Sequence, residues 1–542
     1  MRIAPIISGI LIAVSVSAGQ EQAAITDTSG MPRLEIPEIT IIGKKAITLP
    51  FARKGEIYDV DIYKVPPPDS TLLQDRPPMP LPVGRLPRYD EPLVPLHYSV
   101  EGSLGSYFTG GARGYLDYTG NRWGISGNAG FDATQGHTDH ASGSAVGLET
   151  HGHALIDAGT GETGAFLLNG GILLRHEVYG LFGAQDPSTD RTQNSTTLSL
   201  GAGTLGQDVN AVNFRLAANF LSVSDDRSGV DSSVSTVSPE VSASLRTKAG
   251  VVGLSSDFSF RSSSLDYAHP VELPSLLDFS AGAEWSPVDR ISLRVGGTYD
   301  EGSTSNGDNR SILAPFGEVK WEIDQDRSFR FWIRPSMDFR SYGDFLHENP
   351  YLSRELDIRP ERAPVHFGGT FWYNAGLLSL EINGSFSKTS NTAVTIAQGS
   401  TLILNYVDAS KLVVRGDATL RVENDLLLLL FGVVQPSVED GTTTQLPMVP
   451  LVKLGGRAES SLGTPLNFWS TAEYWSKQNV DLAGSTTLGD RVLFGVGASG
   501  RIAGRVVLSG SIENLFNTAY NWWNGYIAPG RQFMLNARVN LQ

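Results

Sequence analysis

The sequence predicts an all-β protein, a transmembrane antiparallel β-barrel of about 22 strands preceded by a proline-rich N-terminal arm. Apolar and polar side chains alternate over ten to fourteen residues at a time from residue 96 to the C-terminus. Such runs exceed the about five or six residues of an average strand and match the about nine to eleven that cross a bilayer. Long connections between the runs alternate with short ones, which is the second observation that favours a membrane barrel.

The composition excludes several other classes of protein. The chain has 542 residues and no cysteine, so disulfide frameworks, thiolate zinc sites and thiol catalysis are ruled out. Its net charge of -15 argues against a nucleic-acid partner, because phosphate binding needs clustered Lys and Arg. Beyond the N-terminus no apolar run reaches the about eighteen residues of a membrane helix. No serine-hydrolase, zinc-protease or phosphate-loop motif occurs, and we expect no enzyme activity.

The N-terminal part divides into a signal segment and an arm. Residues 1–18 have the pattern of a secretory signal peptide, because Arg2 precedes a short apolar run that ends in small residues. Residues 19–95 form the arm, which has ten prolines between residues 66 and 95 and is expected to run extended in the periplasm. The barrel is expected over residues 96–542, in the outer membrane of a Gram-negative cell.

The alternation gives each predicted strand an apolar face and a polar face. Residues 329–340 show it most clearly, and residues 532–542 repeat it. In the first of these runs the apolar face is expected to hold Phe329, Phe331, Ile333, Pro335, Met337 and Phe339. The other face holds Arg330, Arg334, Asp338 and Arg340, which we interpret as lumen lining. An open sheet edge in lipid would leave N–H and C=O groups without partners, so the strands must close into a barrel.

The count of runs and the lengths of their connections support the same fold. The runs begin near Leu96, Gly110, Arg122, Ser144, Ala165, Thr196, Asn210, Ser233, Gly250, Leu276, Ile291, Ser311, Ser328, Val365, Leu377, Lys411, Leu426, Pro447, Leu466, Arg491, Arg505 and Arg531. Turns after even-numbered runs are mostly short, whereas long connections follow odd-numbered runs, at roughly 177–195, 266–275, 341–364, 390–410, 476–490 and 518–530. Short turns are periplasmic in outer-membrane barrels, so both ends of the barrel are expected in the periplasm.

The C-terminal end carries a recognisable motif. It consists of Asn514, Leu515, Phe516 and Tyr520, followed by Pro529, Gly530 and Arg531. This motif resembles the closing segment of TonB-dependent outer-membrane receptors. The resemblance implies a 22-stranded barrel and a role in the transport of solutes or nutrients across the outer membrane.

A short stretch of the arm adds to this resemblance. Within residues 34–45, Glu38, Ile39, Thr40, Ile41 and Ile42 are similar to the box through which such receptors contact TonB. The expected partners are therefore outer-membrane lipid and either TonB or a separate plug-like or other periplasmic protein. Only about fifty residues, rich in proline, lie between this stretch and the barrel, so the resemblance is expected to hold without the family's plug domain.

Histidines are concentrated on two neighbouring runs. His137 and His140 fall on the loop after the third run, and Glu149, His151 and His153 share the lumen face of the fourth by two-residue spacing. Imidazole and carboxylate groups on one surface are candidate ligands of a transition metal. Since no spacing among them is diagnostic of a metal site, a solvated polar wall is favoured, and no cofactor is expected.

Aromatic residues gather near the C-terminus. Tyr520, Trp522, Trp523 and Tyr526 fall on one long loop, where they either stack on a flat ligand such as a sugar or belong to the aromatic girdle of the barrel. The girdle is the favoured interpretation.

Three functions remain open. A barrel of this many strands encloses a wide lumen, which we expect to be filled by the arm, by infolded loops or by a separate protein. The first function is a component of solute transport. The alternatives are a scaffold or binding module that anchors a partner protein in the outer membrane, and a passive porin.

Overall fold

The computed structural model describes residues 96–541, apart from short connections at 158–164, 185–186, 205–209, 228–229, 267–272, 305–307, 400, 423–425, 462–465 and 504. The signal segment, the proline-rich arm and the box-like residues Glu38–Ile42 lie outside the described residues. The predictions made for them therefore stay predictions.

The described chain is almost entirely strand. The strands of the wall are β1 (Leu96–Gly105), β2 (Thr109–Thr119), β3 (Trp123–Thr134), β4 (Gly143–Asp157), β5 (Ala165–Gly180), β6 (Asp190–Thr204), β7 (Asn210–Arg227), β8 (Val230–Ala249), β9 (Val252–Ser262), β10 (Ser264–Asp266), β11 (Ser275–Val288), β12 (Ile291–Ser303), β13 (Asn309–Glu322), β14 (Arg327–Ile333), β15 (Ser336–Asp338), β16 (Glu361–Ala375), β17 (Leu378–Gln398), β18 (Thr401–Val422), β19 (Leu426–Val434), β20 (Ser437–Glu439), β21 (Val452–Ser460), β22 (Leu466–Trp475), β25 (Arg491–Ala503), β26 (Val506–Glu513) and β29 (Gln532–Asn540). The loops hold η1 (Ser106–Phe108), α3 (Tyr342–Glu348), β23 (Gln478–Asn479), β24 (Thr487–Leu488), β27 (Asn521–Trp523) and β28 (Tyr526–Ile527). None of the described helices is both long and apolar enough to cross a bilayer.

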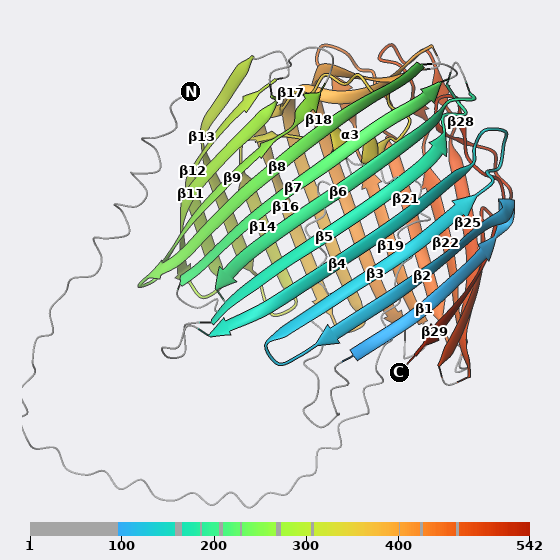
Figure 1. The fold of residues 1–542 in the computed structure, drawn as a ribbon. Helices are drawn as coiled ribbons and strands as arrows, with labels where there is room; N and C mark the ends of the chain where they lie inside the picture. The colour runs from blue at the N-terminus through green and yellow to red at the C-terminus, as the bar shows by residue number, and fades with distance from the viewer. Residues whose placement is uncertain are drawn as a thin grey trace, which may run out of the picture. The chain divides into compact units, whose positions relative to one another are not determined.

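The wall is one closed antiparallel barrel (Figure 1). Its sheet has 25 segments, of which β10, β15 and β20 continue the strand before them after a break, so the wall has 22 strands. The first strand, β1, pairs with the last, β29, from Ser99↔Asn540 to Gly105↔Met534. This seam leaves no open sheet edge, as the membrane requires. The predicted fold class and strand count are confirmed.

The alternation of faces is also confirmed along most of the wall. Phe329, Phe331 and Ile333 of β14 are 38–46% exposed and form part of its apolar outer face. Arg330 of the same strand faces the lumen and donates to Glu318 Oε2 at 2.7 Å. Ion pairs neutralise many lumen charges in this way. Arg113–Asp132 and Arg538–Glu101 join neighbouring strands, whereas Arg294–Asp257 and Lys411–Glu361 reach across one intervening strand.

The predicted face of Met337 and Phe339 is wrong. Both side chains are buried inside the barrel mouth, 6% and 2% exposed, instead of facing lipid. The reason is the break between β14 and β15 at Pro335, which cannot donate a ladder hydrogen bond. Beyond this break the chain turns into the mouth of the barrel, where both side chains join the buried apolar cluster.

The connections follow the predicted parity with one clear exception. Short turns at 120–122, 250–251 and 289–290 lie at the end of the barrel where β1 begins, and the long loops lie at the other end, called here the loop side. Residues 390–410, predicted as a long loop, instead extend β17 and β18, which pair as far as Gln398↔Thr401. Their β-branched residues, such as Val394 and Ile396, favour strand.

The strands differ widely in length around the wall. Strands β17 and β18 have 21 and 22 residues, whereas β26 and β29, next to the seam, have 8 and 9. Crossing the bilayer takes about nine to eleven residues, so the long pair projects beyond the membrane.

Two glycines offer a test of packing on the wall. A Cβ at lumen-facing Gly497 would collide with the indole of Trp469, whereas a Cβ at Gly384 would meet nothing within 4 Å. We expect Gly497→Ala to lower the free energy of unfolding by about 1–3 kcal/mol, because overpacking forces neighbours to shift. Urea unfolding of the barrel in detergent measures the loss. An equal effect of the control variant Gly384→Ala would contradict the packing described here.

Candidate functional site

The connection between β15 and β16, residues 339–360, folds into the loop-side mouth of the barrel and is called here the mouth loop. It contains α3, which lies at that end of the barrel (Figure 1). Its apolar side chains are almost completely buried and pack against side chains on the inner face of the wall. The residues of the mouth loop in this cluster are Phe339, Tyr342, Phe345, Leu346, Leu352, Leu356 and Ile358, and the wall residues include Leu221, Val223, Val234, Leu276, Ile312 and Leu402.

The sequence of the mouth loop favours a short helix. Ser341 is the N-cap, and its Oγ accepts a hydrogen bond from the backbone N–H of Asp344 at 3.2 Å. The Asp344 carboxylate accepts from the backbone N–H of Ser341 at 2.7 Å, which completes a capping box. The helix presents Tyr342, Phe345 and Leu346 to the buried cluster.

A buried arginine ties the mouth loop to the wall. Arg191 of β6 is 2% exposed and binds Asp225 of β7 with two hydrogen bonds, Nε–Oδ1 at 2.7 Å and Nη2–Oδ2 at 3.0 Å. Its Nη1 also donates to the carbonyl oxygens of Pro350 at 2.9 Å and Leu352 at 2.6 Å. From the mouth loop, Arg354 Nε lies 2.9 Å from the same Asp225. A bidentate guanidinium–carboxylate pair fixes geometry as well as charge, so this cluster sets the position of the loop.

Further polar contacts hold the mouth loop along its length. At its start, Arg261 of β9 donates to the carbonyl of Phe339 at 3.0 Å. Near its end, Tyr406 Oη of β18 donates to the carbonyl of Asp357 at 2.6 Å. Between them, the N–H of Ser353 donates to the carbonyl of Leu402 at 2.7 Å. These contacts attach the loop to β6, β7, β9 and β18.

Aromatic side chains join the mouth loop to two other loops. Tyr351 stacks on Tyr526 with ring centroids 3.9 Å apart, and Phe182 contacts both rings edge-on at 5.9 and 5.1 Å. Tyr526 is 1% exposed, and burial raises its pKa to about 12. The girdle interpretation is therefore wrong for Tyr526. Its loop folds back over the mouth, where the ring finds aromatic partners.

The residues of the C-terminal motif brace this last loop. Asn514 adopts a positive φ of 47°, and its Nδ2 donates to the carbonyl of Thr518 at 2.9 Å, while its Oδ1 accepts from the N–H of Thr518 at 2.8 Å. Its Nδ2 also lies 3.4 Å from the carbonyl of Pro529. The N–H of Arg531 donates to Asn517 Oδ1 at 2.8 Å. These contacts hold the two ends of the loop together.

The remaining motif residues line the same turn. The N–H of Leu515 donates to the carbonyl of Phe494 at 2.8 Å, and the ring of Phe516 meets that of Phe494 at 5.0 Å. Tyr520 lies under the Arg491 guanidinium at 5.0 Å, and Gly530 leaves space for the Asn517 side chain. In this structure the motif shapes a loop.

The candidate metal ligands are only partly brought together. His151 Nε2 lies 2.7 Å from Glu149 Oε1, and Asn128 donates to the other Glu149 oxygen at 3.0 Å. His137 is elsewhere, with its Nε2 2.7 Å from the carbonyl of Ile527. His140 lies in the loop turn, and His153 packs beside Gly124. Within the described part of the chain, no three His, Asp, Glu or Cys side chains converge as a metal site would need.

Sequence reasoning missed the residues that place the mouth loop. Arg191, Asp225 and Tyr179, whose Oη donates to the carbonyl of Pro350 at 3.0 Å, are on three successive strands. Their partners in the mouth loop lie far away along the chain, 159 and 171 residues from Arg191 and Tyr179 to Pro350 and 129 (354 − 225) from Asp225 to Arg354. No local pattern marks them. The one available signal is a pair of opposite charges on predicted neighbouring strands, which is common along this wall.

Replacing Arg191 with Met is expected to release the mouth loop. The change leaves Asp225 buried without its main partner, which costs about 3–5 kcal/mol in such pairs. Trypsin should then cut faster after Arg354, as followed by peptide mass. The matched control is Arg215→Met on β7, where the arginine is exposed. Unchanged cleavage in the Arg191 variant would show that the tether does not hold the loop.

Tyr526 of the aromatic cluster should ionise only at a more alkaline pH than a tyrosine in water. The pKa of Tyr526 is raised above its ordinary 10.0 because burial favours the neutral phenol. The contribution of this group to stability is complete below pH about 10 and is lost as the pH rises towards 12. Ultraviolet titration, taken as the difference between the wild type and Tyr526→Phe, should give a midpoint near 12. A midpoint near 10 would mean that the ring is open to water.

Comparisons with known proteins agree with the fold. No protein-family model matches the sequence, and no curated protein matches it either. Solved structures with similar folds include the copper transporter OprC (12% identity, TM-score 0.64, 82% of this chain and 80% of that chain). Others are the FrpB iron transporter from Neisseria meningitidis (12%, 0.65, 82% and 81%) and the ferric yersiniabactin uptake receptor FyuA from Yersinia pestis (14%, 0.60, 82% and 80%). The described chain therefore has the 22-stranded barrel fold of TonB-dependent outer-membrane receptors.

Proposed function

We propose that this protein is a transport component of the outer membrane, which passes a solute through its barrel. In this arrangement the long loops face outward, and both ends of the barrel lie in the periplasm. The fold supports this proposal, since solved structures that share it include a copper transporter, an iron transporter and a ferric yersiniabactin uptake receptor. The short turns at the end where β1 begins support the orientation.

The observation that carries the proposal is the mouth loop. A passive porin keeps a water-filled channel, whereas here a segment with a helix of its own packs inside the mouth. Its cluster of apolar side chains and the Arg191–Asp225 pair hold it in one position. Such a segment restricts entry until it moves, so the arrangement favours gated transport over diffusion.

The N-terminal arm belongs to the same proposal. We propose that Glu38, Ile39, Thr40, Ile41 and Ile42 contact TonB or a separate periplasmic protein, in a chain that lacks a plug domain of its own. Co-purification of the periplasmic domain of TonB with the wild type, but not with a chain lacking residues 38–42, is the corresponding test. Equal retention by both chains would refute the contact.

Single-channel conductance in planar bilayers tests the restriction at the mouth. The variants are one in which residues 341–357 are replaced by a short Gly-Ser linker and one that lacks residues 20–95. We expect low conductance in the wild type and a rise of about tenfold when the mouth loop is replaced, because a barrel of this size encloses a wide pore. Removal of the arm alone should have a smaller effect.

Two other outcomes would decide against this proposal. A wild type as conductive as the loop variant would identify a passive porin. Two variants that both stay closed, together with a stoichiometric partner protein that co-purifies, would instead identify a scaffold.

A further inference from the structure

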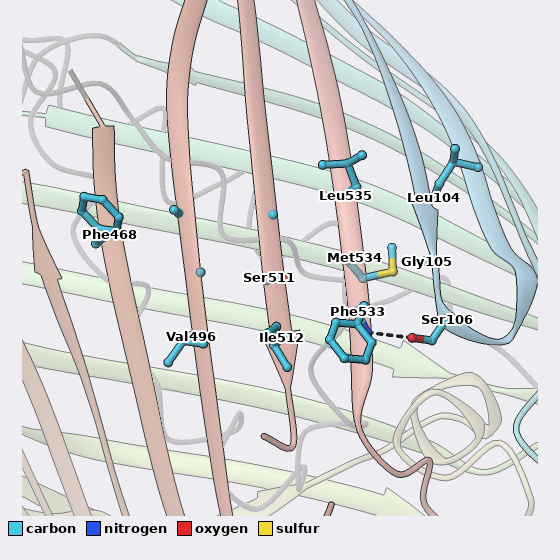
Figure 2. A pocket seen from close by; sticks show the side chains of 13 residues that line it. Leu104, Gly105, Ser106, Phe468, Val496, Ser511, Ile512, Phe533, Met534 and Leu535 are labelled. Atoms are coloured by element: carbon cyan, nitrogen blue, oxygen red, sulfur yellow. Dashed lines mark hydrogen bonds between the residues drawn. The ribbon is translucent and has the colours of Figure 1, made fainter. Parts of the chain in front are cut away.

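The outer face of the barrel carries an apolar hollow of about 820 Å³ beside the seam (Figure 2). Its lining comes from β22, β25, β26 and β29 and from β1 with the first residue of η1, and it contains no charged residue. It therefore spans four gaps between neighbouring strands, or about 19 Å at the usual strand spacing.

The strand register explains why the wall is hollowed here. One row of directly paired residues runs across the five strands, in the order Phe468, Ala498, Gly510, Leu535 and Leu104. The residues at the ends of the row are large, and the two residues on β25 and β26 are small. Paired residues on neighbouring strands share a face, so the small pair leaves a groove between larger side chains.

The hollow opens outward and is closed behind. Leu104, Phe533 and Leu535 are 50–69% exposed on the outer face. On the lumen side, the indole of Trp469 covers the backbone of Gly497, another residue of the lining. A ligand can therefore enter from the lipid side of the wall and not from the lumen.

The backbone N–H and C=O groups at the hollow already have partners. The backbone N–H of Phe533 donates to Ser106 Oγ at 2.7 Å, just beyond the last residue pair of the seam (Figure 2). The remaining strand backbone is paired in the ladders of the sheet. The hollow thus offers contact surface without a polar group that must be matched, which suits a hydrocarbon chain.

We propose that this hollow binds one acyl chain of a membrane lipid. The hollow is continuous with the lipid-facing surface of the barrel, and the small residues Ala498 and Gly510 leave room for one acyl chain between Phe468 and Leu535. Lipid tails elsewhere in the bilayer are equally apolar, so the hydrophobic effect adds little. The preference comes from van der Waals contact with a preformed groove, which a flat wall cannot provide.

Native mass spectrometry with stepwise removal of lipid tests this site, with dipalmitoyl phosphatidylethanolamine added back as the probe. The filled variant carries Ala498→Leu and Gly510→Leu. A Cβ at Gly510 would have its nearest neighbour at 3.8 Å, so the larger side chain fits into the hollow. We expect the wild type to keep one lipid after the others have left. Lipid occupancy in the filled variant should fall about tenfold, because the filled groove has lost its contact surface.

The control is Gly384→Leu, two residues along β17 from the exposed Ile382, where a new side chain meets no neighbour within 4 Å. It should retain the lipid as the wild type does.

If the filled variant does not fold, as judged by heat-modifiable migration on a gel, Ala498→Val replaces it with a smaller expected loss. Equal lipid retention by wild type and filled variant would overturn the proposal. So would a bound mass equal to a free fatty acid, or a dimer that only the filled variant loses, which would assign the hollow to a second copy of the chain.

Discussion

The structure depends on one requirement, that no backbone N–H or C=O group meets lipid without a hydrogen-bond partner. Among the described strands of the wall, β1 and β29 are the two that lack a sequence neighbour on one side, and their pairing with each other meets this requirement. The two strands come from opposite ends of the described chain and have 10 and 9 residues. Closure at this seam turns a row of hairpins into a barrel with an inner face. The mouth loop packs against this inner face, and the lumen ion pairs form along it.

The inside and the outside of this wall are built by different physical rules. Outside, large apolar side chains are exposed because lipid is the solvent, as for Phe331 and Leu535. Inside, charges occur in pairs, and the one extensive apolar cluster among the described residues that reaches across several strands belongs to the mouth loop. That loop combines a buried hydrophobic face with a few charge-assisted hydrogen bonds, such as those of Arg191. Such a combination holds the loop in a single position.

The strands of the wall could be predicted from the sequence, whereas the contacts of the mouth loop could not, and the reason is physical. Two-residue alternation is a local signal, and it located all 22 strands because each strand has lipid on one side. It failed at Met337, where Pro335 breaks the ladder and the face changes, and at residues 390–410, where strand continues outside the membrane. The contacts of the mouth loop, such as that between Arg191 and Pro350, join residues that are distant along the chain and leave no periodic trace. The aromatic residues near Tyr526 were assigned to the membrane interface because composition cannot distinguish a girdle from a folded loop.

The unequal strand lengths make the rim of the barrel uneven in height. A hairpin of 21 and 22 residues stands well clear of the membrane on one side, whereas strands of 8 and 9 residues barely cross it on the other. The rim is tallest at β17 and β18 and lowest at β26 and β29, next to the seam. The tip of the tall hairpin lies beyond the part of the wall that crosses the bilayer, so sequence change is most easily tolerated there without harm to insertion.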